Sequence, residues 1–202
     1  MRQDPDGRVR LAVCHMLGMI GRGAKDVAPQ LVEVMKESKD EKMRQTAAGS
    51  LWRVVGPDSK NIVPGLLQIY KNEKDESRGI KSNLLISMAI IGDKEEILIP
   101  LLVRVLQDPK NLKLRATGAA GLGYFGPKSK EAVPALIAAL DVSAFKDAGE
   151  AFLTQSSVLE ALGKIGPAAK AAIPAVRKIA LDPGINLSIR LAAEKTFELI
   201  QK

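Results

Sequence analysis

Five glycines recur along the chain, and each is followed eight residues later by a proline. The glycines are Gly21, Gly56, Gly92, Gly126 and Gly166. The prolines are Pro29, Pro64, Pro100, Pro134 and Pro174, and successive prolines are separated by 35, 36, 34 and 40 residues. A period of this length is typical of repeat proteins, in which each repeat is one supersecondary unit that packs on its neighbours. This regular spacing of glycines and prolines therefore predicts an architecture of stacked repeats.

A helix-period apolar pattern precedes each glycine, and we name this predicted helix of each repeat helix A. Apolar residues three to four positions apart form one buried stripe of a helix. Glycine can adopt the left-handed conformation that ends a helix, so each glycine marks the expected end of helix A. The stripe is Val9, Val13, Leu17 and Ile20 in the first repeat, Leu114, Gly118, Leu122 and Phe125 in the fourth, and Thr154, Val158, Leu162 and Ile165 in the fifth.

A second amphipathic segment, helix B, begins near each proline. Proline is tolerated in the first turn of a helix because no N–H is needed there. Two such helices joined by a short connection form an αα-hairpin, which cannot bury both apolar stripes alone and therefore stacks on its neighbours. The sequence predicts an all-α fold, a right-handed α-solenoid of about five hairpins followed by a half-repeat.

One repeat domain, 1–202, is expected. The predicted repeats are approximately 6–39, 40–74, 75–110, 111–141 and 150–184, with a half-repeat at 185–202 and an insertion at 142–149. Inserted loops often carry functional residues. The alternative for this one is a solvent-exposed segment without a specific role. Asp4-Pro5 matches the later inter-repeat pairs Asp108-Pro109 and Asp182-Pro183. We therefore expect the chain to be a fragment of a longer array, or its half-repeat to act as a C-terminal cap.

The repeated motif resembles a known family. Its pattern, V-R-x-x-A-x-x-A-L-G-x-I-G-P followed by A-V-P-A-L, is best matched at 114–140 and 154–180 and is similar to the HEAT repeat, in particular to the short HEAT-like repeats of phycobilisome lyases. Tetratricopeptide repeats place aromatic residues and prolines differently, and armadillo repeats have a third helix for which the spacing leaves no room. The resemblance implies a superhelix in which the B helices line a concave surface that commonly binds another protein.

Residues suited to catalysis or metal binding are scarce. The chain has one histidine, His15, and one cysteine, Cys14, so the usual zinc ligand sets cannot be assembled. His15 is expected on the surface, and Cys14, at a small-residue position of helix A, in the core. No nucleophile elbow or phosphate-binding P-loop motif is present. We expect neither enzymatic activity nor a cofactor nor a metal.

Charge and hydropathy favour a protein partner over nucleic acid or a membrane. The formal net charge is +7, but no stretch is polybasic, and aromatic residues make up only 3% of the chain. No run approaches the roughly 18 apolar residues of a membrane span. The polar N-terminus lacks the apolar segment of a signal peptide, and the single cysteine fits a reducing compartment. We therefore expect a cytoplasmic protein with no membrane span, for which nucleic acid is a disfavoured partner.

A basic residue recurs near the start of helix A. The series is Arg10, Arg44, Lys81, Arg115 and Arg190, and Gln155 interrupts it. The family resemblance implies an Asp–Arg ladder that joins successive repeats through Asp40, Asp108 and Asp182. The alternative is a row of phosphate contacts.

The predicted function is that of a non-catalytic protein-interaction scaffold. Its partner is expected on the B-helix side chains that point away from the core stripe. These residues are Gln30, Glu33, Gln68, Lys71, Arg104, Gln107, Ala135, Ala138 and Lys178. The alternatives are a nucleic-acid-binding protein similar to the HEAT-like DNA glycosylases, or an auxiliary factor of the bilin-lyase type.

Overall fold

The computed structural model describes residues 7–74, 78–109 and 111–202, and these residues form α-helices and short 3-10 helices without a β-strand. Asp4 and Pro5, on which the expectation of a preceding repeat rests, lie outside the described residues, as do several residues at the predicted repeat boundaries. The chain divides into two compact units, Met1–Lys94 and Glu95–Lys202. Each unit has a buried core that consists mainly of Leu, Ile, Val and Ala side chains.

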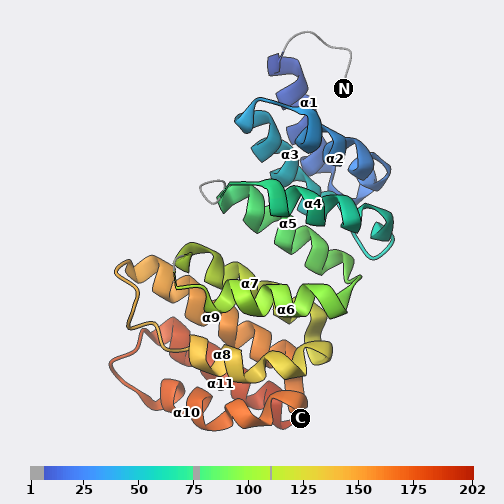
Figure 1. Cartoon of the computed structure of the whole chain (residues 1–202). Helices are drawn as coiled ribbons and strands as arrows, with labels where there is room; N and C mark the ends of the chain where they lie inside the picture. The colour runs from blue at the N-terminus through green and yellow to red at the C-terminus, as the bar shows by residue number, and fades with distance from the viewer. Residues whose placement is uncertain (1–6, 75–77, 110) are drawn as a thin grey trace. The chain divides into compact units, whose positions relative to one another are not determined.

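The first unit contains helix A of three repeats and helix B of two. Its elements are α1 (Gly7–Ile20), η1 (Gly21–Val27), α2 (Ala28–Glu37), α3 (Glu41–Val54), η2 (Lys60–Ile62), α4 (Val63–Asn72) and α5 (Arg78–Ile91). The A helices α1, α3 and α5 pack side by side in that order, and each B helix packs against the A helix that follows it (Figure 1). Helices α2 and α4 are also neighbours.

The second unit repeats this arrangement. Its elements are α6 (Glu95–Gln107), α7 (Leu112–Phe125), η3 (Gly126–Ala132), α8 (Val133–Ala139), α9 (Ala148–Ile165), η4 (Gly166–Ala172), α10 (Ile173–Leu181) and α11 (Leu187–Gln201). The A helices α7, α9 and α11 are stacked, and the B helices α6, α8 and α10 pack against α7, α9 and α11 respectively (Figure 1). Each unit is therefore a stack of helical hairpins.

The glycines end helix A as predicted in four of the five repeats. Gly21, Gly92, Gly126 and Gly166 have positive φ values between 54° and 68°, which side chains other than glycine rarely adopt. Gly56 does not fit the prediction. Helix α3 ends at Val54, one residue before the end expected from the other repeats. Its C-cap, Val55, has an extended conformation with φ −74° and ψ 158°. The second repeat has one extra residue before its glycine, so the chain leaves the helix before Gly56 is reached.

The prolines also have their predicted place in most repeats. Pro29, Pro64, Pro134 and Pro174 occupy the first turns of α2, α4, α8 and α10. Pro100 is different, because α6 begins at Glu95 and contains this proline inside the helix. The connection from helix A to helix B, predicted as a short loop, is a seven-residue 3-10 segment in η1, η3 and η4.

The predicted apolar stripe is buried in the fourth and fifth repeats and partly exposed in the first. Leu122 and Leu162 are fully buried. In α1, however, Val9 is 43% exposed and Ile20 is 59% exposed, so the prediction is wrong for these two residues. The physical reason is that, among the described elements, α1 has its main contacts with α3 and η1, and these leave the side of α1 that carries Val9 and Ile20 accessible.

Small residues let the helices approach closely. A Cβ atom added to Gly18 of α1 would lie 2.7 Å from Ser50 Oγ of α3, and one added to Gly123 of α7 would lie 3.1 Å from Ala161 Cα of α9. At Gly118 of α7, a Cβ would lie 2.9 Å from the Leu102 carbonyl oxygen of α6. The spacing of neighbouring helices in each unit therefore depends on positions that have room for hydrogen alone.

Replacing Gly118 with alanine is predicted to destabilise the second unit. The new methyl group would meet the backbone of α6 rather than a movable side chain, and overpacking of this kind costs about 1–3 kcal/mol. The matched control is Gly49→Ala in α3, where the nearest atom to an added Cβ is Asn83 Nδ2 at an ordinary 3.7 Å. There, alanine should raise the free energy of unfolding by up to about 1 kcal/mol, because it is the better helix former. Urea unfolding measures both changes, and equal effects at the two glycines would contradict the proposed close packing.

Candidate partner-binding surface

In the first unit, α2 and α4 present a polar surface. Gln30 of α2 and Gln68 and Lys71 of α4 are exposed, as predicted from the helix pattern. Glu33 is partly exposed and forms an ion pair with Lys36, with 3.3 Å between Glu33 Oε1 and Lys36 Nζ. Because the two helices are neighbours, these side chains belong to one continuous surface.

A groove of about 560 Å³ lies where α2 and α4 end. Gln68 is the one predicted partner-binding residue in its lining. The lining residues are Met35, Lys36, Ser38, Glu41, Arg44, Gln68, Ile69, Asn72, Glu73 and Lys74. Most of these side chains are polar, and both charges are represented. The groove is therefore suited to hydrogen bonding with a polypeptide more than to enclosing an apolar small molecule.

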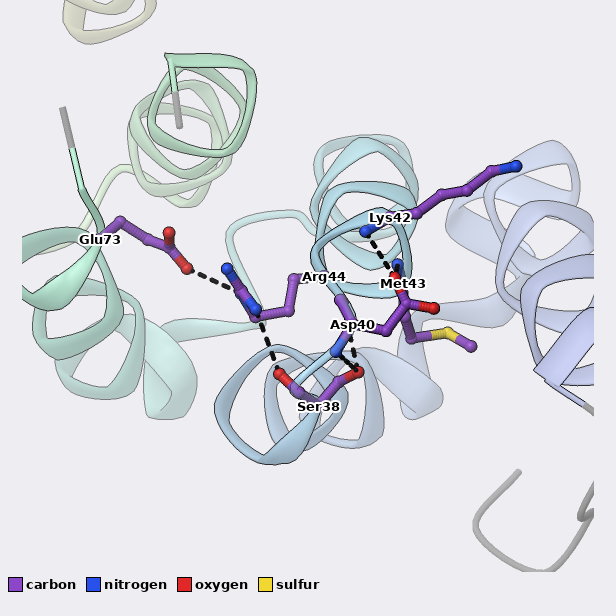
Figure 2. A network of polar contacts seen from close by, with 6 residues as sticks. All are labelled: Ser38, Asp40, Lys42, Met43, Arg44 and Glu73. Carbon is purple, nitrogen blue, oxygen red and sulfur yellow. Dashed lines mark hydrogen bonds and ion pairs between the residues drawn. The ribbon is translucent and has the colours of Figure 1, made fainter. Parts of the chain in front are cut away.

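Arg44 connects the two helix ends at this groove (Figure 2). Its Nε donates to Glu73 Oε1 at 3.0 Å, and its Nη1 donates to the Ser38 carbonyl oxygen at 3.3 Å. Ser38 is the C-cap of α2 and Glu73 is the C-cap of α4. A cation is stabilised near the C-terminus of a helix, where carbonyl groups lack partners in the helix. Arg44 thus fixes the end of one B helix relative to the next.

The predicted Asp–Arg ladder is wrong at this position. Asp40 does not pair with Arg44; its carboxylate accepts hydrogen bonds from the backbone N–H groups of Lys42 and Met43 at 2.9 and 3.4 Å and so caps the N-terminus of α3 (Figure 2). An aspartate immediately before a helix is a strong N-cap. Asp147 has the same role at α9, whereas the N-cap positions of α7 and α11 are Asn111 and Asn186. The acidic partner of Arg44 is Glu73, which the sequence pattern did not single out.

The second unit shows a related bridge at Arg115. Its Nε donates to the Leu106 carbonyl oxygen at 2.7 Å, at the end of α6, and its guanidinium lies 5.4 Å from the centre of the Phe145 ring. Asp141 follows α8, and its pKa is lowered, mainly because the Ser143 backbone N–H donates to its carboxylate, with the Arg115 charge adding to this effect. Phe145, in the insertion at 142–149, therefore lies against Arg115, a partly exposed residue of α7.

The same register position has different roles in the next two A helices. Gln155 of α9 keeps the carbonyl contact, since its Nε2 donates to the Leu140 carbonyl oxygen at 3.1 Å. Arg190 of α11 has its Nε buried without a hydrogen-bond partner among the described residues. The position therefore contacts the end of the preceding B helix through either arginine or glutamine in three of these repeats. At Arg44, an acidic residue after the following B helix, Glu73, completes the bridge.

Most of the predicted surface residues of the second unit are exposed. Arg104 and Gln107 of α6, Ala138 of α8 and Lys178 of α10 all face solvent. The prediction of an exposed partner-binding residue is wrong for Ala135, because it is only 8% exposed and belongs to the core. Helix α8 is seven residues long and contacts α6, α9, η3 and η4, so its neighbours cover a small side chain in its first turn.

The chemistry available elsewhere is limited. His15 is exposed and Cys14 is fully buried, as the sequence predicts, and burial raises the pKa of the Cys14 thiol. Within the residues that the structure describes, no group of three or more His, Cys, Asp or Glu side chains could hold a metal ion. Nor does any helix among them have the length and apolar character needed to cross a bilayer.

Comparisons with known proteins agree with this architecture. A family model described as HEAT repeats matches residues 1–52, and one described as the PBS lyase HEAT-like repeat matches residues 114–141. The chain carries HEAT repeats. A solved structure of a designed armadillo repeat protein is similar at a TM-score of 0.56 and 16% sequence identity, covering 98% of this chain and 96% of that one. No curated protein sequence matches the chain significantly.

The HEAT-repeat assignment and the armadillo-like structure establish an all-α repeat solenoid, as predicted. This fold is typical of non-enzymatic scaffolds, and it suggests a protein partner. At 16% identity the structural likeness concerns the fold alone. The repeats themselves do not specify which protein is bound, because function on a common fold depends on particular surface residues.

Breaking the Arg44 bridge is predicted to destabilise the first unit. The side chains of Arg44 and Glu73 are only 21% and 9% exposed, so either variant, Arg44→Met or Glu73→Gln, leaves a poorly solvated polar partner. The expected loss in the free energy of unfolding is about 1–3 kcal/mol. Lys128→Met is the matched control, because the pair it forms with Glu95 is largely exposed and should change stability by less than about 0.5 kcal/mol. Urea unfolding measures these changes. An equal loss in the free energy of unfolding for all three variants would contradict the bridge.

Proposed function

We propose that the chain is a non-catalytic scaffold that binds another protein on the surface of its B helices. The proposed contact residues are Gln30, Glu33, Gln68 and Lys71 in the first unit and Arg104, Gln107, Ala138 and Lys178 in the second. Ala135 lies beneath this surface and supports it. No cofactor or metal takes part in the proposed interaction.

The observation that carries the proposal is the groove at the ends of α2 and α4. Gln68 is part of its lining. The lining also includes the Arg44–Glu73 ion pair, whose side chains are mostly buried, and the exposed side-chain amide of Asn72. Ordered polar groups next to a groove favour binding because little side-chain freedom remains to be lost when a partner docks. A polypeptide has the alternating donors and acceptors that such a lining can satisfy.

The charge distribution supports a protein partner over nucleic acid. Several lysines that contribute to the positive net charge are in ion pairs, with Asp58, Glu33, Glu95 and Glu160 as the acidic partners of Lys25, Lys36, Lys128 and Lys164. Tyr70, the aromatic residue of α4, is half-buried with Lys81 Nζ 5.6 Å from its ring centre. Single-stranded nucleic acid is normally bound by exposed aromatic rings along a basic groove, and the B-helix surface is not of that kind.

Affinity capture with a charge-reversed variant tests the proposal. The triple variant Lys71→Glu, Arg104→Glu, Lys178→Glu alters three exposed cations of the B helices. The control triple variant Lys60→Glu, Lys130→Glu, Lys170→Glu makes the same charge change on η2, η3 and η4. A protein captured by the unmodified chain should be lost or reduced at least tenfold on the first variant and retained on the second. Both variants should keep the unmodified melting temperature, because all six side chains are exposed.

Two results would contradict the proposed surface. One is equal capture by the two triple variants. The other is tight binding of a DNA duplex or single strand at low salt that weakens steeply as salt is added, because counterion release is the signature of phosphate contacts. The second result would favour the nucleic-acid-binding alternative.

A further inference from the structure

In the second unit, a segment of the chain itself lies beside the bridging arginine. The insertion at 142–149 follows α8, and the centre of its Phe145 ring is 5.4 Å from the Arg115 guanidinium. The same guanidinium donates from its Nε to the Leu106 carbonyl oxygen at the end of α6. An aromatic ring and the end of a B helix therefore meet at one arginine.

Short-range hydrogen bonds form the turn that carries this ring. The Asp141 carboxylate accepts from the Ser143 backbone N–H at 2.9 Å, and the Phe145 backbone N–H donates to the Val142 carbonyl oxygen at 3.0 Å. An aspartate that bonds the backbone two residues ahead is a common turn former. A free peptide of this sequence therefore contains every group that these two hydrogen bonds need.

Arg44 has the same register position in the first unit, and no aromatic ring of the described residues lies against it. Its Nε and Nη1 donate to Glu73 and to the Ser38 carbonyl oxygen. Hydrogen bonds of this kind lie in the plane of the guanidinium and leave its flat faces for stacking. The Arg44 side chain is 21% exposed, and it lines the groove of about 560 Å³ at the ends of α2 and α4.

The same groove has an apolar part. Met35 and Ile69 belong to its lining and are only 2% and 6% exposed, so they form its base. An aromatic ring is attracted to a guanidinium through its face and to a methionine sulfur through its edge. The groove thus combines a cation with apolar side chains, and these are the neighbours that an aromatic side chain prefers.

We propose that this groove binds a segment of the partner protein through an aromatic side chain that stacks on Arg44, as Phe145 stacks on Arg115. Gln68 and Asn72, both exposed in the same lining, supply amide groups to the backbone of that segment. The proposal rests on the proposed B-helix surface and specifies the chemistry of its partner in the first unit.

The lining favours a polypeptide over a nucleobase, which can also stack on an arginine. Glu41 and Glu73 line the groove, and their carboxylates repel the phosphate groups that accompany a base. In addition, the ring that occupies the equivalent position in the second unit belongs to a polypeptide segment. The occupant is therefore a loop or an extended segment of a protein with an aromatic residue.

Nuclear magnetic resonance of the complete chain with isotope-labelled arginine tests the site, because it resolves individual Nε–H groups. The probe is a capped peptide with the sequence of residues 141–147, Asp-Val-Ser-Ala-Phe-Lys-Asp, and its counterpart has alanine in place of the phenylalanine. The phenylalanine peptide should shift the Arg44 signal through its ring current and leave the Arg115 signal in place. The alanine peptide has the same charge and should bind at least about fivefold more weakly, because it lacks the ring.

Removing the ring of the insertion provides a second readout. Phe145→Ala exposes the equivalent position in the second unit, so the phenylalanine peptide should then shift the Arg115 signal as well as the Arg44 signal. The matched control is Phe152→Ala, which removes a ring that is 38% exposed at the start of α9 and should leave the Arg115 signal unaffected by the peptide. Circular dichroism establishes that both variants are folded.

Four results would overturn the proposal. The first is a phenylalanine peptide at millimolar concentration that leaves the Arg44 signal in place. The second is equal affinity of the two peptides, which would refute the aromatic contact and leave the B-helix surface standing. The third is a Phe145→Ala chain whose Arg115 signal does not respond to the peptide. The fourth is a single-stranded oligonucleotide that shifts the Arg44 signal while the peptide does not. Failure of the B-helix surface itself is measured separately, by equal capture with the two triple variants.

Discussion

Close packing between successive A helices is the constraint on which the rest of each unit depends. A Cβ atom added to Gly18, Gly123 or Gly163 would lie 2.7, 3.1 or 3.0 Å from the nearest atom of the next A helix, so a larger side chain would crowd the contact. A hydrogen bond adds to this contact between α9 and α11, where Thr196 Oγ1 donates to the Leu159 carbonyl oxygen at 3.0 Å. Because the distance between packed helices is set by the side chains at their contact, these small residues also set the spacing of the B helices.

The arginines that contact the ends of the B helices then give the surface at these ends a defined arrangement. Arg44 contacts the C-caps of α2 and α4, so the groove between these helix ends has a fixed polar wall. Arg115 contacts the end of α6 and also the ring of Phe145, which brings the insertion at 142–149 against the repeat. A single residue type at one register position thus stabilises the stack and orders groups that are available to a partner. In the proposed scaffold, stability and binding would be coupled at these positions.

Much of the fold could be predicted from the sequence because glycine and proline have specific backbone requirements. Positive φ at Gly126 and Gly166, and the first-turn positions of Pro134 and Pro174, follow directly from those requirements. What the sequence pattern missed depends on neighbours in space. Ala135 is covered because α8 is short and flanked on both sides, and Val9 is exposed because α1 has its main described contacts with α3 and η1 alone.

The candidate site was predicted less completely than the fold, for a similar reason. Helix periodicity identified the exposed Gln68 and Lys71, but periodicity describes one helix at a time. The partner of Arg44 lies 29 residues away in the chain, and its identity as Glu73 follows only from where the end of α4 lies in the folded unit. The acidic residue directly after helix B at Glu73 is the sequence signal that could have indicated this bridge.

Hydrogen–deuterium exchange of the chain with a captured partner tests most directly whether the B helices form the binding surface. Amide exchange reports on each helix of each unit without altering any side chain. The account predicts that binding slows exchange in α2 and α4, most strongly at the helix ends around the groove, and in α6 and α10 where the partner extends that far. Slower exchange confined to the A helices or to the 3-10 connections, with α2 and α4 unchanged, would contradict it.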